Sequence, residues 1–430
     1  MGKRGSRRKS AESLGTNDDD SVSSSSADMS KLTLVSRTEV VQRDSSLDSW
    51  LEALYEKRGS TREKALSLII EAFTKNLQHQ FVEKNFVTLL DRYLHSIKRG
   101  SAKEICLASR ALGLLAMITE DKAHELLEAS LHPLSEALKS GSEISKISHI
   151  IECLAVITFI GDNDGEESEG VMQIIWEFIC QKTGSKSKLS PAVITAISSW
   201  SFILSNANGC CLNSKNWQEA VSHFSTLLEK DDRSVCIAAG EALAILFEIG
   251  CPKIKKDSAD AIQQLKGKIL YQVEDLSREA GGRGSNKEDL GSQRNLFRDL
   301  LKFLRDGSCP ETSMKIGGDL LNTDTWSELI QLNLLKHFLG ERFSKHMQSA
   351  TNLPLPNQEN ELLRSRYKFT LMKKHISSGE KKLQKSQFAS SHKEMTRALN
   401  KERNSSQQAK SGHFAACDDS EWVHRSGAFD

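Results

Sequence analysis

Seven lysines and arginines are spread over residues 381–403, with few acidic and few apolar residues between them. A helix-prone segment of this kind suits a polyanion, because each neutralised phosphate releases counterions and backbone contacts require no reading of bases. The sequence predicts either a free polar tail or an arm that becomes ordered on a nucleic acid. The predicted nucleic-acid-binding residues are Lys381, Lys382, Lys385, Lys393, Arg397, Lys401 and Arg403.

A second basic cluster lies within the first ten residues, which contain no acidic side chain. It predicts a nuclear-import element or a weak contact with a polyanion, and its members are Lys3, Arg4, Arg7, Arg8 and Lys9. The same stretch begins MGKRGS and matches the MGxxx[ST] acylation pattern, so Gly2 is a candidate for myristoylation. Because so short a pattern often matches by chance, a membrane is the least favoured partner.

The positive and negative charges of the chain almost cancel, but they are unevenly distributed. Residues 361–410 carry 13 basic and 4 acidic side chains, a net charge of +9. Residues 11–360 carry 39 basic and 49 acidic side chains, a net charge of −10. Such a chain can present its basic ends to polyanions while its acidic body repels them.

Histidine and cysteine could bind a metal or take part in catalysis. The 12 histidines and 9 cysteines form no HExxH motif, no zinc-ligand spacing and no nucleophile motif. The acidic stretch 161–170 lacks the spacing of a calcium loop and predicts a solvated turn. We therefore expect no catalytic residue, metal or cofactor, and a protein that is not an enzyme. Within helical patterns, we expect buried thiols and packed or surface imidazoles at Cys106, Cys153, Cys180, Cys236, His95, His124, His149 and His223.

Helical periodicity runs from about residue 46 to residue 348, and four of the expected helices resemble one another. Their segments align at positions separated by 42, 43 and 46 residues. This period is typical of HEAT and armadillo proteins, whose helix pairs complete their core by stacking. The sequence predicts an all-α, HEAT/armadillo-like α-solenoid of five or six helix pairs. The segments align at Ala111, Cys153, Ala196 and Ala242, and Gly113, Ala155, Ser198 and Ala244 are small residues where a neighbouring helix comes close.

We expect four segments along the chain. They are a disordered, basic and serine-rich tail at 1–44, a repeat domain at 45–306, a C-terminal domain at 307–378 that docks on the solenoid, and a basic helical arm with a disordered tail at 379–430.

Local signals add detail to this division. Three capping boxes, Ser60 with Glu63, Ser101 with Glu104 and Ser285 with Glu288, predict the starts of three helices. The stretch from Cys309 to Thr323 predicts a short extended hairpin, and residues 325–348 predict one helix. Farther on, an apolar stripe predicts a helix that docks on the core, and its members are Leu362, Phe369, Met372 and Ile376.

Four segments carry a family resemblance: KRGSTREKALSLI at 57–69, ALGLLAMIT at 111–119, DTWSELIQLNLLKHFLGERFSKHMQ at 324–348 and ENELLR at 359–364. Together with the basic, serine-dotted stretch that follows, they resemble the interferon-related developmental regulators from about Arg58 to Arg403. The chain departs from the family pattern at 349–358, where it inserts SATNLPLPNQ. The resemblance implies a regulatory protein rather than a catalyst.

The family resemblance implies two kinds of activity. Its members are transcriptional co-regulators that work with histone-deacetylase complexes, and some occupy inactive ribosomes with a C-terminal helix in the mRNA path. We therefore expect a monomeric regulatory scaffold that binds proteins through its solenoid and ribosomal RNA through its basic arm, repressing translation under stress or differentiation.

Two alternatives stay open. One is a nuclear co-regulator that docks chromatin co-repressor complexes, and the other is an N-myristoylated, membrane-tethered adaptor. The chain shows no secretory signal and no window of about 18 uninterrupted apolar residues. We expect it in the cytoplasm and the nucleus.

Overall fold

The computed structural model is built almost entirely of helices. It describes residues 46–119, 121–140, 143–162, 165–184, 191–206, 212–250, 256–278, 287–316, 319–351 and 370–373.

A short helical segment at 46–53 comes first. The helices that follow are α2 (Gly59–Lys75), α3 (His79–Arg99), α4 (Ala102–Ile118), α5 (Ala123–Lys139), α6 (Ile144–Gly161), α7 (Glu166–Thr183), α8 (Pro191–Asn206), α9 (Ser214–Leu227), α10 (Arg233–Ile249), α11 (Lys256–Arg278), α12 (Lys287–Asp306), α13 (Trp326–Leu339) and α14 (Phe343–Thr351). The strands are β1 (Thr312–Ile316), β2 (Asp319–Thr323) and β3 (Thr370–Lys373).

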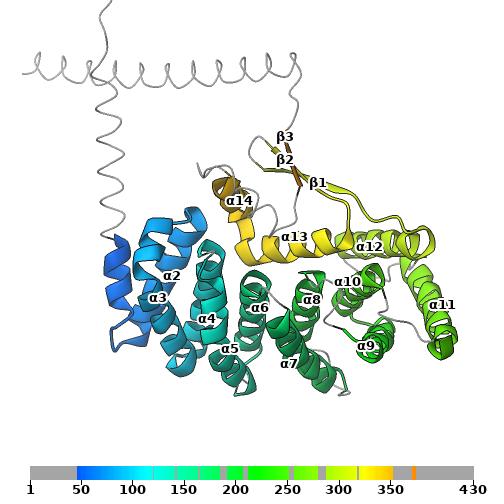
Figure 1. Cartoon of the computed structure of the whole chain (residues 1–430), viewed down its shortest axis with the longest axis horizontal. Helices are drawn as coiled ribbons and strands as arrows, with labels where there is room; N and C mark the ends of the chain where they lie inside the picture. Colours follow the sequence, from blue (N-terminus) through cyan, green and yellow to red (C-terminus); the bar gives the residue numbers. More distant parts are fainter. Residues whose placement is uncertain are drawn as a thin grey trace, which may run out of the picture. The chain divides into compact units, whose positions relative to one another are not determined.

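The helices from α2 to α12 form two rows, which Figure 1 shows side by side. The inner row consists of α2, α4, α6, α8, α10 and α12, and each of these helices packs on the next one in the row. The outer row consists of α3, α5, α7, α9 and α11, and each packs on the inner helix that follows it in sequence. This stacking of helix pairs confirms the predicted all-α solenoid.

The inner helices are apolar on nearly every side because other helices surround them. The four aligned positions, Ala111, Cys153, Ala196 and Ala242, are all 0% exposed, which confirms the alignment of the repeats. Among the described helices, α6 alone has the length and composition to cross a membrane, and 67% of that stretch is buried inside the structure. That burial is typical of a core helix.

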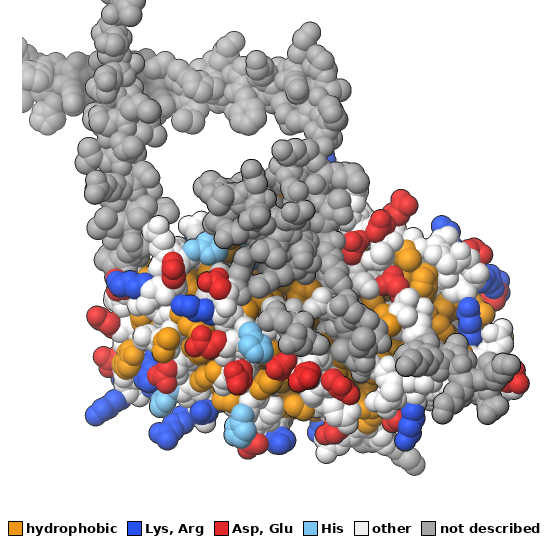
Figure 2. All heavy atoms as spheres, viewed as in Figure 1, with side chains coloured by type: hydrophobic (Ala, Val, Ile, Leu, Met, Phe, Trp, Pro, Cys, Tyr) orange, Lys and Arg blue, Asp and Glu red, His pale blue; other side chains and the backbone are white. Residues whose placement is uncertain are grey.

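The outer helices are amphipathic and keep one face in solvent. In α3, Phe86 and Tyr93 are buried against the inner row, whereas Val87, outside that face, is 70% exposed. Figure 2 shows acidic side chains in a row across the middle of one face of the molecule, with lysines and arginines mostly along its rim. Charges therefore lie where the outer faces meet water.

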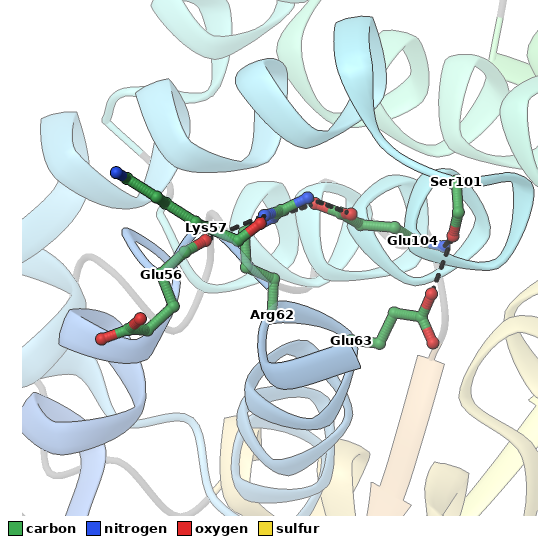
Figure 3. A network of polar contacts seen from close by, with 6 residues as sticks. All are labelled: Glu56, Lys57, Arg62, Glu63, Ser101 and Glu104. Atoms are coloured by element: carbon green, nitrogen blue, oxygen red, sulfur yellow. Dashed lines mark hydrogen bonds and ion pairs between the residues drawn. The ribbon is translucent and has the colours of Figure 1, made fainter. Parts of the chain in front are cut away.

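An ion pair joins the start of the solenoid to the second helix of the inner row (Figure 3). Arg62 in α2 donates from Nε and Nη2 to the two carboxylate oxygens of Glu104 in α4, at 2.7 and 2.8 Å. Its Nη1 donates to the backbone carbonyls of Glu56 and Lys57. Glu104 is only 1% exposed, and the positive charge of the Arg62 guanidinium offsets the free-energy cost of burying its carboxylate.

Of the three predicted capping boxes, the one at Ser285 lies outside the described residues, and of the other two only the serine cap at Ser101 forms. Ser101 caps α4 by accepting the N–H of Glu104 at 3.1 Å. The box of Ser60 with Glu63 is wrong, because α2 has Arg58 as its N-cap, with no side-chain cap, and begins at Gly59. The Glu63 carboxylate instead accepts the hydroxyl of Ser101 at 2.7 Å, so a contact between helices replaces the local one.

The single helix predicted at 325–348 is broken. Helix α13 ends at Leu339, a 3-10 turn spans Gly340–Arg342, and α14 begins at Phe343. Gly340 has a φ of +62°, a conformation that side-chain-bearing residues rarely adopt. The turn lets α14 leave the direction of α13 and pack on α2.

The three strands form an antiparallel sheet in the order β1-β2-β3. The pair β1 and β2 is the hairpin that the sequence predicted, with Met314 opposite Leu321. Met372 was predicted in a docking helix, and this prediction is wrong: it lies in β3, opposite Leu320. Pairing of the backbone with β2 outweighs the helical spacing of the stripe, whose other members lie outside the described residues.

The chain divides into two compact units. Among the described residues, one unit contains the helices and the other contains the sheet of β1, β2 and β3. The four predicted segments remain a prediction.

Candidate functional site

All the site residues predicted from the sequence lie outside the described residues. They are the arm residues Lys381, Lys382, Lys385, Lys393, Arg397, Lys401 and Arg403, the N-terminal residues Lys3, Arg4, Arg7, Arg8 and Lys9, and Gly2. Their roles stay predictions, and the described helices supply the candidate surfaces.

The start of α13 is fixed to the inner row by one carboxylate. Glu248 at the end of α10 accepts the backbone N–H groups of Trp326 and Ser327, at 2.7 and 2.8 Å, and the hydroxyl of Ser327. Thr325 caps the same turn by accepting the N–H of Glu328. A negative charge at a helix N-terminus also offsets the positive end of the helix dipole. These contacts tie α13 to α10.

The middle of α13 crosses α8 and α10. Gln331 donates from its amide to the carbonyl of Ser205 in α8, at 3.4 Å. Burial of Glu241 in α10 raises its pKa to about 7, against the opposing effect of a hydrogen bond with Asn333 in α13. The interface between α10 and α13 therefore holds a carboxyl group that titrates near neutrality.

The end of α13 reaches α4 and α6. Arg110 in α4 donates to the carbonyl of Phe338 at 2.9 Å, and its guanidinium lies 5.9 Å from the centre of that ring. A Cβ on Gly113 would lie 2.6 Å from the ring, so a glycine permits this approach. His337 pairs with Glu152 in α6 at 3.1 Å, and this carboxylate raises the pKa of the imidazole.

Helix α13 thus covers one face of the inner row, from α10 to α4 (Figure 1). The face of the inner row beneath α13 is therefore not open to solvent along these contacts. A cavity opens on the outer row between α7 and α9, and Trp200 of α8 contributes to its lining. Its volume is about 680 Å³.

One wall of this cavity is the start of α7. Asp162, just before the helix, accepts the N–H groups of Gly165 and Ser168, both at 2.9 Å. Burial raises the pKa of this carboxyl, but hydrogen bonds from the turn outweigh it and hold the pKa below its usual value. These hydrogen bonds fix the first turn of α7, from which Glu166 and Glu169 line the cavity.

The opposite wall is α9. Asn213 caps this helix by accepting the N–H of Asn216 at 2.8 Å, and Trp217 donates from its indole to the carbonyl of Leu246 at 2.9 Å. These bonds fix the helix on α10, with Asn216 and Glu219 lining the cavity. Two walls from different helices therefore present carboxylates to the same space.

Aromatic rings form the base of the site. The ring of Trp176 in α7 lies 5.7 Å from that of Trp200, 5.6 Å from Phe224 and 5.2 Å from His223. Burial lowers the pKa of His223, which favours the neutral imidazole in this cluster. The combination of carboxylates, indole and amide can bind a cation.

Sequence reasoning missed this site for a physical reason. The acidic stretch 161–170 was predicted to be a solvated turn, although its last five residues begin α7 and three of them, Glu166, Glu169 and Gly170, line the cavity. Trp176 has the helical spacing of a core residue, and Glu219 lies 43 positions after it. The only usable signal was an acidic first turn followed by a tryptophan.

The prediction of four buried thiols is half right. Cys153 and Cys236 are buried, but Cys106 and Cys180 are only half-buried. Periodicity identifies the packed face of a helix without separating its centre from its edge.

The thiol of Cys106 is the main group that raises the pKa of His149, to about 9. Among the described residues, no three histidines, cysteines or carboxylates are grouped as metal ligands.

Known proteins resemble this chain along most of its length. A family model described as Interferon-related developmental regulator matches residues 18–305. Interferon-related developmental regulator 2 of Mus musculus is 25% identical over 332 residues, which cover 75% of this chain and 72% of the relative. Interferon-related developmental regulator 1 of Homo sapiens is 24% identical over 317 residues, covering 70% and 68%.

Solved structures with a similar arrangement include a designed armadillo repeat protein, at 16% identity with a TM-score of 0.40. It covers 59% of this chain and 99% of its own. The family match spans both rows of the solenoid and ends before α13. Because the match covers well over half of the sequence, the chain belongs to the interferon-related developmental regulator family.

Proposed function

We propose that this chain is a non-enzymatic regulatory scaffold that binds proteins through its helical repeats and ribosomal RNA through the basic arm at 379–430, repressing translation under stress or differentiation. Family membership supports the regulatory part. The net charge of +9 over residues 361–410, after an acidic body, supports the RNA part.

The observation that carries the proposal is the pairing of β3. This strand bonds to β2 along Thr370–Lys373, and Lys381 follows only eight residues later. A basic segment that starts beside a paired strand is tethered at one end, so less of its freedom is lost on binding. RNA can then be held by phosphate contacts alone.

Sedimentation through sucrose gradients tests the arm. We expect the tagged full chain to travel with ribosomes at low salt. If the arm neutralises seven phosphates, raising the salt concentration from 50 to 200 mM should weaken binding about a thousandfold. Replacing the seven arm residues, Lys381 to Arg403, by glutamine should abolish cosedimentation. The matched control replaces Lys3, Arg4, Arg7, Arg8 and Lys9 by glutamine and should still sediment. An arm variant that sediments like the unmodified chain would refute the RNA contact.

A second candidate is a nuclear co-regulator that docks chromatin co-repressor complexes, favoured by five basic residues between positions 3 and 9 without an acidic neighbour. The same N-terminal variant tests it by imaging. Under this function the variant stays in the cytoplasm, whereas the unmodified chain occupies both compartments. Unchanged nuclear entry would deny the cluster an import role.

A further inference from the structure

The cavity between α7 and α9 has an acidic and aromatic lining that plays no part in the proposed RNA contact. Its polar and aromatic lining consists mainly of Glu166, Glu169, Glu219, Trp176, Trp200 and Asn216. None of the described lining residues is a lysine or arginine, so three carboxylates face the space without a basic neighbour there. The cavity is open to solvent on one side, where the three glutamates are exposed, and its volume of about 680 Å³ lies in the range of ligand pockets.

The two walls favour an occupant that is positively charged. Glu166 and Glu169 project from α7 and Glu219 from α9, so a cation between the helices gains from both sides. Trp176 is half-buried, and its ring is held by Trp200 and Phe224. A ring fixed by its neighbours offers its surface to a cation with little loss of side-chain freedom. Phosphate groups would be repelled, which excludes nucleic acid as the ligand.

The kind of cation follows from the shape of the groups. A metal ion needs a compact set of ligands, and no such set of three occurs among the described residues. A guanidinium is planar, stacks on an indole and bonds to a carboxylate through two N–H groups, whereas an ammonium is a strongly hydrated point charge. We propose that this cavity binds an arginine side chain presented by a peptide segment of a partner protein. The proposal rests on the scaffold part of the proposed function.

Fluorescence anisotropy with the full chain tests the site. The probe is a fluorescein-labelled peptide of eight residues with two arginines among glycines and serines. Matched peptides carry lysine or citrulline at the same positions, and citrulline keeps the shape of arginine without its charge. We expect the arginine peptide to bind about threefold more tightly than the lysine peptide, and no binding of the citrulline peptide.

Two variants locate the binding. The double substitution Glu169→Gln with Glu219→Gln should weaken the arginine peptide about tenfold, because it removes a charge from each wall. The matched control, Glu125→Gln with Glu128→Gln, makes the same charge change at exposed positions of α5 and should leave binding unaltered. Trp176→Phe keeps an aromatic ring and should weaken binding about threefold, with circular dichroism as the check on folding.

Three outcomes would overturn the proposal. The first is equal affinity for the arginine and citrulline peptides. The second is an equal loss of affinity for the arginine peptide in the two double variants. The third is tighter binding of that peptide once the seven arm residues are replaced by glutamine. The last would identify the basic arm of this chain, rather than a partner, as the occupant. Ribosome sedimentation of the Glu169→Gln, Glu219→Gln variant separates this site from the RNA contact, since it should not change.

Discussion

The two rows of the solenoid are built from different kinds of helix. Inner helices such as α6 are buried on nearly every side, because two neighbours in the row and an outer helix surround each one. Outer helices such as α7 bury one face and expose the other. The repeat positions lie in the inner row, whereas most of the cavity lining comes from α7 and α9 in the outer row.

This difference separates the residues that determine the fold from those available for recognition. Close packing leaves little choice of side chain in the inner row, so its repeats stay recognisable in the sequence. The solvent-exposed faces of the outer row carry no such restriction. Functional groups there can differ from one helix to the next without cost to stability.

A core substitution tests the comparison most strongly. Leu154→Ala, at a position in α6 that is 0% exposed, should lower the free energy of unfolding by about 3 kcal/mol. Val87→Ala in α3, at a 70% exposed position, should change it by less than about 0.5 kcal/mol. Urea unfolding followed by circular dichroism measures both. Similar losses of unfolding free energy in the two variants would contradict the difference in burial between the inner and outer rows.

Removing the partner of a buried charge should have a slightly smaller effect. Arg62→Ala leaves Glu104 buried and unpaired, so we expect a loss of about 3 kcal/mol at most. Lys75→Ala removes an exposed pair with Glu71 in the same helix and should cost less than about 0.5 kcal/mol. Equal melting temperatures of the two variants would show that the ion pair between α2 and α4 contributes nothing.

Acid should destabilise the fold through a histidine in α14, the helix that packs on α2. Burial, and secondarily the charge of His79, lower the pKa of His346 in α14 to about 4. Below pH 6.5 the unfolded chain therefore binds a proton that the folded chain does not, and stability falls as the pH drops toward 4. At pH 5 this amounts to about 2 kcal/mol.

The variant His346→Leu should lose less stability than the unmodified chain between pH 7 and pH 5, as measured by urea unfolding at each pH. His132→Gln, at an exposed position of α5, serves as the control and should follow the unmodified chain. Parallel curves for His346→Leu and the unmodified chain would rule out His346 as the source.

The smallest effect is expected where α13 approaches α4. Gly113→Ala puts a Cβ within 2.6 Å of Phe338, which must shift, although alanine favours the helix more than glycine does. We expect a net loss of about 1 kcal/mol. Gly267→Ala in α11 meets no atom within 4 Å and should stabilise by about 0.5 kcal/mol. Thermal unfolding that ranked the two variants the other way would contradict the close approach.

Local patterns predicted much of the solenoid. Helix α4 starts after Ser101 and ends at Ile118, as its cap and its apolar run indicated. Contacts between distant residues were not predictable. The Glu63 carboxylate bonds to Ser101 instead of capping its own helix, and Met372 pairs with Leu320, 52 positions earlier. The cavity was missed for the same reason, because Trp176 and Glu219 meet only through packing.

Helix α13 comes after every helix that it covers. During synthesis, the inner helices leave the ribosomal tunnel before the residues that seal them, and the apolar surface around Gly113 stays open meanwhile. A nascent chain at this stage is a substrate for chaperones. A premature stop codon before Trp326 would leave that surface exposed permanently, and the truncated product should aggregate or be degraded.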